Sequence, residues 1–412
     1  MILNKVKNSS LSMRIVVGSI IGLIIGFVLG ENAESLKFLG DIFLRSVKMC
    51  VPLLIFCSIV EATASLPLKE LKTVGLKTLG VFFVSTSLAA VLSIIAVKII
   101  PINLTLTAPG SDAYKGTVAG GNIQETIVNF IPDNAVGALA EGVIVQIIVF
   151  AALFGISVNI MKDSFESVNA LYELILGLRK VIMKIVSIVM VYAPIGISAM
   201  LAGVIGTSGV DALKSLVQVI VIVSILDIIF FVLYTLYVAI RYRLSIVTLL
   251  KNSLNIMVIA VTTTSSAITL PVSLEDVPKK MGVKERISDF VLPLGNALNT
   301  NGSPISNIVS AVACASVFDI QFTLQNLILL GVFSVVASFG NPGVPGGGIV
   351  SMAIVFQMIG IPVEGVAIFA GLDYFYSLTR APLNVMGNVY SSIIVGIKTG
   401  EFDRNVFESS TN

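Results

Sequence analysis

Five polar residues repeat at helical spacing in an apolar segment near the C-terminal end of the 412-residue sequence: Asp373, Ser377, Arg380, Asn384 and Asn388. Their separations of 4, 3, 4 and 4 positions place them within an arc of roughly 80° on an α-helix. A charged side chain near the centre of a bilayer costs about 2.5–3.5 kcal/mol, so such residues usually face a cavity or a partner. The stripe therefore predicts a polar site inside a membrane helix.

Arg380 is the residue best suited to bind the charge of a substrate. Its guanidinium group is a planar fork that can hold a carboxylate through two hydrogen bonds. The alternative is that Asp373 and Arg380 simply neutralise each other, although a separation of two helical turns would strain such a pair. We favour a site for an anionic substrate.

Oxygen atoms that could bind a cation are also present in this part of the chain. Asn299, Asn301, Asn384 and Asn388 offer amide carbonyl groups, and Asp373 offers a carboxylate. Transporters commonly add carbonyl groups of unwound backbone to such ligands. For each asparagine the alternative is a role in packing or in interrupting a helix.

The composition places these residues in a membrane protein. The chain is 56% hydrophobic and 12% charged, with a mean hydropathy of +0.99, whereas soluble domains carry roughly 25% charged residues. The apolar residues come in blocks near the ~20 residues that cross a bilayer as a helix. Membrane strands would instead alternate over segments of ~10 residues. We therefore predict an all-α polytopic membrane protein.

Six apolar blocks in the first 240 residues predict six transmembrane helices. Basic residues before the first block (Lys5, Lys7 and Arg14) place the N-terminus in the cytoplasm, and the later basic links agree with six crossings. The first block could be mistaken for a signal peptide, but no convincing small-residue cleavage site follows it. The predicted spans are Met13–Leu29, Phe43–Ala64, Thr78–Pro101, Val143–Met161, Leu171–Gly206 and Leu216–Ile240.

Segment Asn252–Val277 is apolar but has strongly basic sequence on both sides, so a single crossing would leave one basic cluster outside. A re-entrant hairpin that enters and leaves from the cytoplasm removes this conflict. Its tip would be Thr262–Ala267, and non-helical backbone at that depth must be buried in protein or line a cavity. The hydroxyl groups of Ser265 and Ser266, together with backbone N–H groups at the start of a helix, suit an anion.

A second set of interrupted segments follows. Span Ile287–Val317 is interrupted by Asn299–Pro304, and the last span is Gly365–Ile397. Between them, Phe322–Ile361 is predicted to form a second hairpin, because the prolines and glycines of its tip, Gly340–Gly348, break any helix. No Lys or Arg flanks this hairpin, so it would enter from outside.

Hairpin, broken span, hairpin and polar span thus form two units of opposite orientation. Paired interrupted segments in corresponding positions are the best sequence indication of a transporter's midplane site. The prediction is eight transmembrane helices plus two re-entrant helical hairpins, arranged as inverted repeats. Simple kinks in ordinary helices are the alternative, but kinks alone would not explain the charged flanks.

Other classes of function are disfavoured by what the sequence lacks. It has no histidine, its three cysteines lie in apolar runs without paired spacing, and it has no G-x-x-x-x-G-K-[ST] loop. We therefore expect no enzyme activity, disulfide framework, ATP-driven pumping, nucleic-acid partner or cofactor beyond a transported Na⁺ or H⁺. A passive anion channel is the remaining alternative class. Asp227, in the sixth span, is either a proton-relay group or a residue that faces a partner helix or subunit.

These features together resemble the dicarboxylate/amino acid:cation symporters, the glutamate-transporter family, over essentially the whole chain. The resemblance rests on Phe43–Leu66 with its Leu-Arg-x-x-Lys-Met run, Val191–Ile195, the serine-rich tip ending in Thr269-Leu270-Pro271, Leu292–Gly295, Asn299–Ser303, Gly343–Gly346 and the last span from Asp373 to Asn388.

The resemblance implies the glutamate-transporter-homologue fold and a homotrimer in the inner (plasma) membrane, with both termini cytoplasmic. It also implies a transport domain that moves as a rigid body against a scaffold, which is an elevator mechanism. Residues 1–240 would be mostly scaffold and trimerisation helices with some transport-domain helices, residues 241–400 the transport core, and residues 401–412 a cytoplasmic tail.

The resemblance also assigns the site residues. The expected substrate-binding residues are Ser265, Ser266, Ser303, Gly343, Ser377, Arg380 and Asn384. The expected cation-binding residues are Ser85, Thr86, Asn299, Asn301, Asp373, Asn384 and Asn388, with a Na⁺ site at Asn299 and Asp373.

Three departures from the family pattern shape the hypothesis. Ser377 stands where amino-acid carriers of the family have an aspartate for the substrate's amino group, and the pattern from Ser377 to Asn388 is similar to the four-carbon dicarboxylate branch. Asn301 and Asn388 replace two carboxylates, which predicts fewer coupled sodium ions, or protons. We therefore expect symport of Na⁺ and/or H⁺ with a dicarboxylate such as succinate, fumarate or malate. An acidic or other amino acid:sodium symporter of the same family is the alternative.

Overall fold

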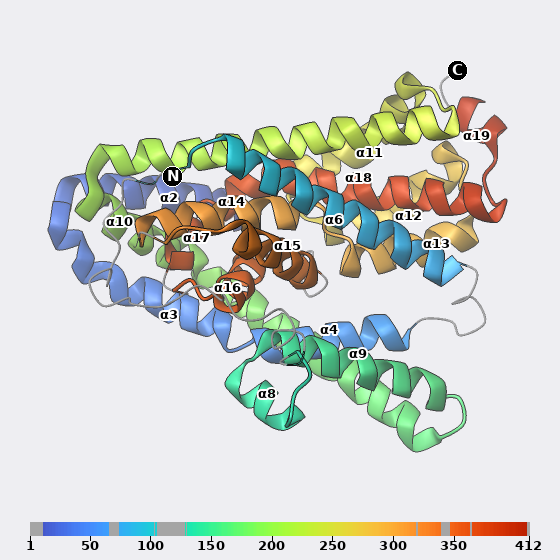
Figure 1. Ribbon diagram of the computed structural model, residues 1–412, viewed down its shortest axis with the longest axis horizontal. Helices are drawn as coiled ribbons and strands as arrows, with labels where there is room; N and C mark the ends of the chain where they lie inside the picture. Colours follow the sequence, from blue (N-terminus) through green and yellow to red (C-terminus); the bar gives the residue numbers. More distant parts are fainter. Residues whose placement is uncertain are drawn as a thin grey trace, which may run out of the picture.

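The computed structural model is a bundle of long helices (Figure 1). It describes residues 11–65, 74–102, 104, 128, 130–318, 320–338, 347–362 and 365–409. Within these ranges there is no β-strand, and the isolated β-bridge pairs Val283 with Phe402. The all-α prediction is confirmed.

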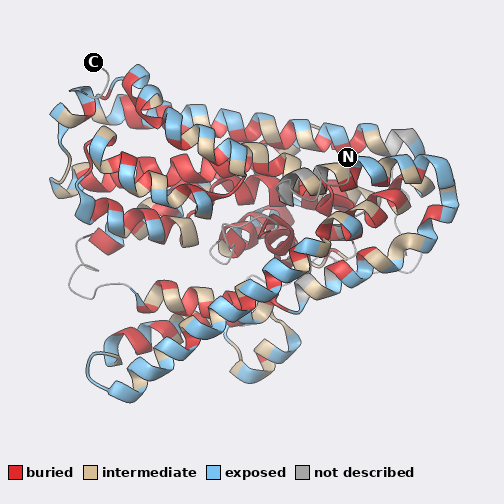
Figure 2. Cartoon of the chain, turned by 180° about the vertical axis from the view of Figure 1, so that it is seen from behind, coloured by how far each residue is buried: buried red, intermediate tan, exposed pale blue. Residues whose placement is uncertain are grey.

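Five helices in the described part of the chain are long and apolar enough to cross a bilayer: Val17–Phe43, Leu76–Ile99, Glu166–Thr207, Leu213–Tyr242 and Ile246–Thr263. Their outward faces expose large apolar side chains such as Leu88, Ile188 and Leu233. Extended apolar surface of this kind marks a surface that meets lipid. Buried residues gather in the interior of the bundle instead (Figure 2).

The first helices pack against the long helix α10. These elements are α2 (Leu11–Leu29), the 3₁₀ helix η1 (Gly30–Leu36), α3 (Lys37–Lys48) and α10 (Glu166–Tyr242). Gly18, Gly22 and Gly26 of α2 lie so close to the backbone of α10 that an added Cβ would overlap it. Small residues at this spacing let membrane helices approach closely.

Two predicted boundaries differ from the structure. The predicted span Phe43–Ala64 is interrupted, because α3 ends at Lys48 and α4 (Val51–Ala64) begins with Pro52 in its first turn, where a missing N–H does no harm. The predicted fifth and sixth spans are joined through α10, which bends at Gly209 (φ 69°, ψ −158°) and doubles back along the bundle (Figure 1).

The predicted third and fourth spans are α6 (Leu76–Ile99) and α9 (Ile144–Met161). Helix α9 packs against α4, where Phe56 stacks on Phe150 with ring centroids 6.0 Å apart. The link before α9 contains the short helix α8 (Ala135–Glu141), and most of residues 102–142 lie outside the described residues.

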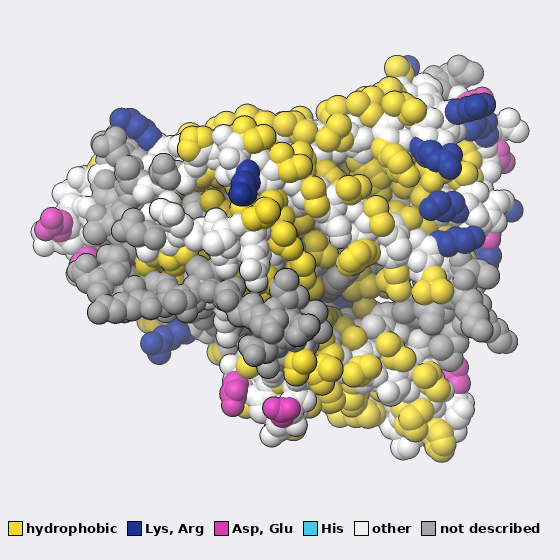
Figure 3. All heavy atoms as spheres, in the orientation of Figure 1, with side chains coloured by type: hydrophobic (Ala, Val, Ile, Leu, Met, Phe, Trp, Pro, Cys, Tyr) yellow, Lys and Arg dark blue, Asp and Glu magenta, His cyan; other side chains and the backbone are white. Residues whose placement is uncertain are grey.

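The first hairpin is formed by α11 (Ile246–Thr263) and α12 (Ser266–Met281), which pack against each other. Its two ends lie at the same end of the bundle, because Asn252 Nδ2 donates to the carbonyl oxygen of Lys280 at 2.7 Å. The short helix α19 (Arg404–Ser409) closes this end, where Lys and Arg side chains gather at the right of Figure 3. The predicted re-entrant hairpin is confirmed, although α11 alone is long enough to span a membrane.

The broken span, the second hairpin and the last span follow in the predicted order. Their helices are α13 (Glu285–Leu298), α14 (Gly302–Val317), α15 (Leu324–Ser338), α16 (Gly347–Ile359), α17 (Val366–Ala370) and α18 (Asp373–Thr399). The predicted break at Asn299–Pro304 is shorter than expected, because the helix resumes at Gly302 and tolerates Pro304 in its first turn. The last span is not continuous either, since it is interrupted at Gly371 and Leu372.

Candidate functional site

The polar stripe of α18 faces the interior of the bundle. Each of its five residues, from Asp373 to Asn388, is only 5–6% exposed. Helices α10, α11, α12, α13, α14 and α6 all pack against α18. The side chains that are costly in lipid are therefore enclosed by protein.

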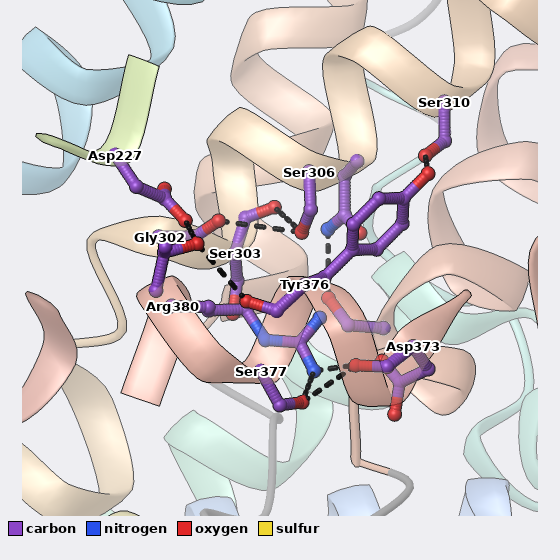
Figure 4. A network of polar contacts seen from close by, with 12 residues as sticks. Asp227, Gly302, Ser303, Ser306, Ser310, Asp373, Tyr376, Ser377 and Arg380 are labelled. Atoms are coloured by element: carbon purple, nitrogen blue, oxygen red, sulfur yellow. Dashed lines mark hydrogen bonds and ion pairs between the residues drawn. The ribbon is translucent and has the colours of Figure 1, made fainter. Parts of the chain in front are cut away.

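Arg380 is at the centre of a network of polar contacts (Figure 4). Its Nη2 atom donates to Asp373 Oδ1 and to Ser377 Oγ, both at 2.7 Å. The sequence alone disfavours this ion pair. In the structure, however, Asp373 and Arg380 do neutralise each other. The two side chains are each 7% exposed.

The second terminal nitrogen of Arg380, Nη1, takes no part in these hydrogen bonds. Nη1 is buried and has no hydrogen-bond partner among the described residues. A buried donor without an acceptor is costly, and more so when it is charged. Arg380 can therefore neutralise Asp373 and still offer a donor to a second carboxylate.

Two helix N-termini approach Arg380. An added Cβ at Gly348, in the first turn of α16, would overlap the guanidinium nitrogens and Asp373 Oδ1, and one at Gly302, the first residue of α14, would press on the stem of Arg380. The backbone N–H of Gly302 donates to Asn384 Oδ1 at 2.8 Å. Helix N-termini carry partial positive charge and favour anions. Arg380 and these two termini therefore lie close together, with Asp373 as the neighbouring negative charge.

Replacing Gly348 with alanine is expected to raise the KM for the transported anion at least about 10-fold, which corresponds to about 1.4 kcal/mol. The added methyl group would displace the guanidinium from its position against Asp373. Uptake kinetics in proteoliposomes measure the change. Gly177→Ala is the matched control, since nothing lies within 4 Å of that Cβ position; equal KM values for both variants would contradict the assigned close approach.

The tip of the first hairpin is a two-residue link. Helix α11 ends at Thr263 and α12 begins at Ser266, with the side chain of Ser265 capping α12 by accepting from Ile268 N at 3.4 Å. Thr264 adopts a left-handed conformation (φ 50°), which costs a β-branched residue roughly 1–2 kcal/mol. Backbone strain of this kind concentrates at functional sites. Thr264, Ser265 and Ser266 are all buried.

Most of the predicted cation-binding residues converge at a second cluster. The hydroxyl groups of Ser85 and Thr86 of α6 lie 3.1–3.3 Å from both Asn299 Oδ1 and Asn301 Oδ1, so each can donate to either amide oxygen. Asn299 Nδ2 in turn donates to Asn388 Oδ1 at 2.9 Å. The break in the span thus supplies two amide oxygens, α6 two hydroxyl groups and α18 a third amide, which is an oxygen-rich site of the kind that hard cations use.

Asp373 stands apart from this cluster. Its Oδ1 atom accepts from Arg380. Within the described residues, no hydrogen bond joins Asp373 to the asparagines that were predicted to bind a cation with it. Over the described ranges, no group of three or more His, Cys, Asp and Glu side chains is arranged to hold a metal ion. A cation at the asparagine cluster would therefore rely on neutral oxygen ligands.

Some predicted residues are placed and others are not. Ser303 is fully buried near Arg380 at the start of α14 (Figure 4), whereas Gly343 lies outside the described residues. Two residues were not predicted from the sequence. Gly348, which lies against Arg380, was predicted only as part of the tip of the second hairpin, and Thr379 was not singled out at all. The side chain of Thr379 lies off the stripe and donates to Asp227 Oδ2 at 2.7 Å.

Two helical hairpins and a broken span, packed around the buried polar stripe of α18, are typical of a membrane transporter. The chain matches the sequence profile of the sodium:dicarboxylate symporter family over residues 11–397, and it belongs to that family. It is thus a transporter and not an enzyme.

Curated relatives cover nearly the whole chain. A C4-dicarboxylate transport protein of Allorhizobium ampelinum is 32% identical over 97% of this chain and 91% of its own length. A proton/glutamate-aspartate symporter of Bacillus subtilis is 30% identical over 93% and 94% of the two chains. A proton/sodium-glutamate symport protein of Bacillus caldotenax is 29% identical over 95% of each.

Proposed function

We propose that the protein is a secondary active symporter that couples the inward movement of Na⁺ or H⁺ to the uptake of a four-carbon dicarboxylate such as succinate, fumarate or malate. The observation that carries this proposal is the buried Arg380, whose Nη1 atom has no acceptor among the described residues and lies beside two helix N-termini. One carboxylate of the substrate would accept from Nη1. The other carboxylate would lie toward the tip of the first hairpin, with Ser265 and Ser266.

Ser377 favours a dicarboxylate over an amino acid. An ammonium group in a buried site needs a carboxylate partner. The carboxylate nearest to Arg380 is Asp373, and it is already engaged by the guanidinium. Ser377 is neutral and accepts from the same nitrogen, so it adds no negative charge for an ammonium group.

Coupling is assigned to the asparagine cluster. Ser85, Thr86, Asn299, Asn301 and Asn388 would hold the coupling cation, and Asn384 would link this cluster to the substrate through its contact with Gly302. Cation and substrate would thus both contact the broken span. Binding of one then favours binding of the other, which is the thermodynamic basis of symport.

Assembly and orientation belong to the same proposal. The basic end of the bundle would face the cytoplasm of a plasma-membrane protein, with both termini on that side. A homotrimer with an elevator motion would use residues 1–240 mostly as scaffold and residues 241–400 as transport core. The packing of α6 against α14, α15 and α18 supports the inclusion of some N-terminal helices in that core.

A substrate panel in proteoliposomes tests the proposal, with sodium and proton gradients imposed separately. Labelled succinate is expected to accumulate only when a gradient is present, and excess fumarate or malate is expected to block it. Aspartate that outcompetes succinate would overturn the choice of substrate. Equilibration without accumulation under either gradient would indicate a passive channel.

A further inference from the structure

Asp227 is a buried carboxylate that the substrate and cation sites do not use. It lies in the second part of α10 and is 1% exposed. Thr379 Oγ1 donates to its Oδ2 atom at 2.7 Å, while Oδ1 is buried with no hydrogen-bond partner among the described residues. This burial is achieved within a single chain, so a partner subunit is not needed to cover the residue.

An ionised carboxylate is costly in such a place. A buried carboxylate is tolerated when its oxygens are hydrogen-bonded or paired with a cation, and otherwise it is neutralised by a proton. Here the hydroxyl group of Thr379 serves one oxygen only. The other oxygen, Oδ1, is the atom on which a proton would be held.

Among the described residues, the charged group that interacts with Asp227 comes from one neighbouring helix. On α18, Arg380 follows Thr379 directly and interacts electrostatically with Asp227. Helices α14 and α17 pack against α10 and carry no charged residue. Lys77 and Lys98 of α6, and Lys251 of α11, are exposed. The charged residues of α2, η1 and α3 belong to helices that pack beside the first part of α10, before Gly209.

The charge balance ties Asp227 to the substrate. Arg380 and Asp373 together carry no net charge, so an ionised Asp227 leaves this region with one negative charge. A dicarboxylate would add two more, giving three negative units in a buried place before any coupling cation is counted. A proton on Asp227 removes one of them. Because like charges repel strongly at low dielectric, the dianion favours the protonated form.

We propose that Asp227 is a proton-binding site that is loaded together with the dicarboxylate, so that one coupling ion is a proton carried on Oδ1. The inference rests on the proposed function for its substrate. An O–H bond forms at Oδ1 when the carboxylate takes a proton from hydronium on the side where the substrate binds, leaving water. The same bond breaks when the substrate leaves on the other side. By reciprocity, the proton raises the affinity for the dianion as much as the dianion favours the proton.

Proton movement per succinate is the quantity to measure. Proteoliposomes that contain a pH-sensitive dye report internal acidification, while labelled succinate reports uptake in the same vesicles. Asp227→Asn is expected to lower the ratio of protons to succinate at least 10-fold, because the amide keeps an acceptor for Thr379 but binds no proton. The ratio does not depend on how much of the variant folds. Asp163→Asn, an exposed change of the same type, should keep the wild-type ratio.

A second measurement needs no transport. Purified wild-type protein in weakly buffered detergent solution is expected to take up protons when succinate is added, and Asp227→Asn is expected to take up none. A wild-type protein that carries succinate without protons would overturn the inference and leave the proposed function intact, and so would an Asp227→Asn variant with the wild-type ratio. A wild-type protein that neither binds nor carries succinate would instead overturn the proposed function.

Discussion

Alanine at position 380 is expected to abolish measurable succinate uptake. Truncating one partner of a buried, hydrogen-bonded charge pair costs about 2–5 kcal/mol, which is roughly 30-fold to several thousand-fold in affinity. Arg380 is 6% exposed, and its Nη1 atom is the buried donor proposed to meet the substrate. Initial uptake rates over a range of succinate concentrations measure the loss.

The loss of Arg380 also leaves Asp373 as a buried charge without its partner, which can destabilise the fold by about 3–5 kcal/mol. The double variant Arg380→Ala/Asp373→Asn removes both charges and separates the two effects. It should be as stable as the wild type by thermal unfolding in detergent and still fail to carry succinate. Lys279→Ala, a change at an exposed surface ion pair, is the control and should keep wild-type uptake. Wild-type uptake by the double variant would remove Arg380 from the site.

The hairpins show how much the sequence can predict. Both flanks of the first hairpin are basic, and this local feature excluded a single crossing even though α11 passes as a span by length and hydropathy. The distribution of Lys and Arg between the two sides of a membrane can be read from the sequence alone. The break between α13 and α14 was equally predictable, because residues 299–304 are rich in Asn, Gly, Ser and Pro, which favour turns and helix ends over helix interiors.

The ion pair of Arg380 with Asp373 is a contact that was not predicted from the sequence. A separation of seven residues is about 10 Å along a helix, and in the sequence alone this distance disfavours contact between the two side chains. Side chains on a helix point back toward its N-terminus, however, so the long stem of Arg380 covers the turns before it. Asp373 is the first residue of α18, where no earlier turn of the same helix competes for that space.

The close approach of Gly348 and the position of Thr379 could not be predicted for a different reason. Both depend on which helix of the bundle faces which, and this is a property of tertiary packing. Gly348 is one of three successive glycines in the sequence, and only its contact with Arg380 sets it apart. Thr379 gains its importance from Asp227, which is 152 residues away in the chain.

A carboxylate in place of Ser377 is expected to reverse the substrate preference. Ser377 Oγ lies 2.7 Å from Arg380 Nη2, so Ser377→Asp would put a second negative charge beside the guanidinium. A dianionic substrate would then meet a like charge in a buried site, at a cost of several kcal/mol. An amino acid would gain a partner for its ammonium group. The expected result is at least a 10-fold loss of succinate uptake and a new uptake of aspartate, measured with each labelled substrate in proteoliposomes.

Ser377→Asn is the matched control for this reversal, because it has nearly the same size and polarity without the charge. It should weaken succinate uptake through altered packing against Arg380 but should give no aspartate uptake. The comparison isolates charge from volume, since the two variants differ only in an amide and a carboxylate. If Ser377→Asp still prefers succinate to aspartate, then the neutral residue at position 377 does not select the substrate. The choice would then have to come from other residues of the site.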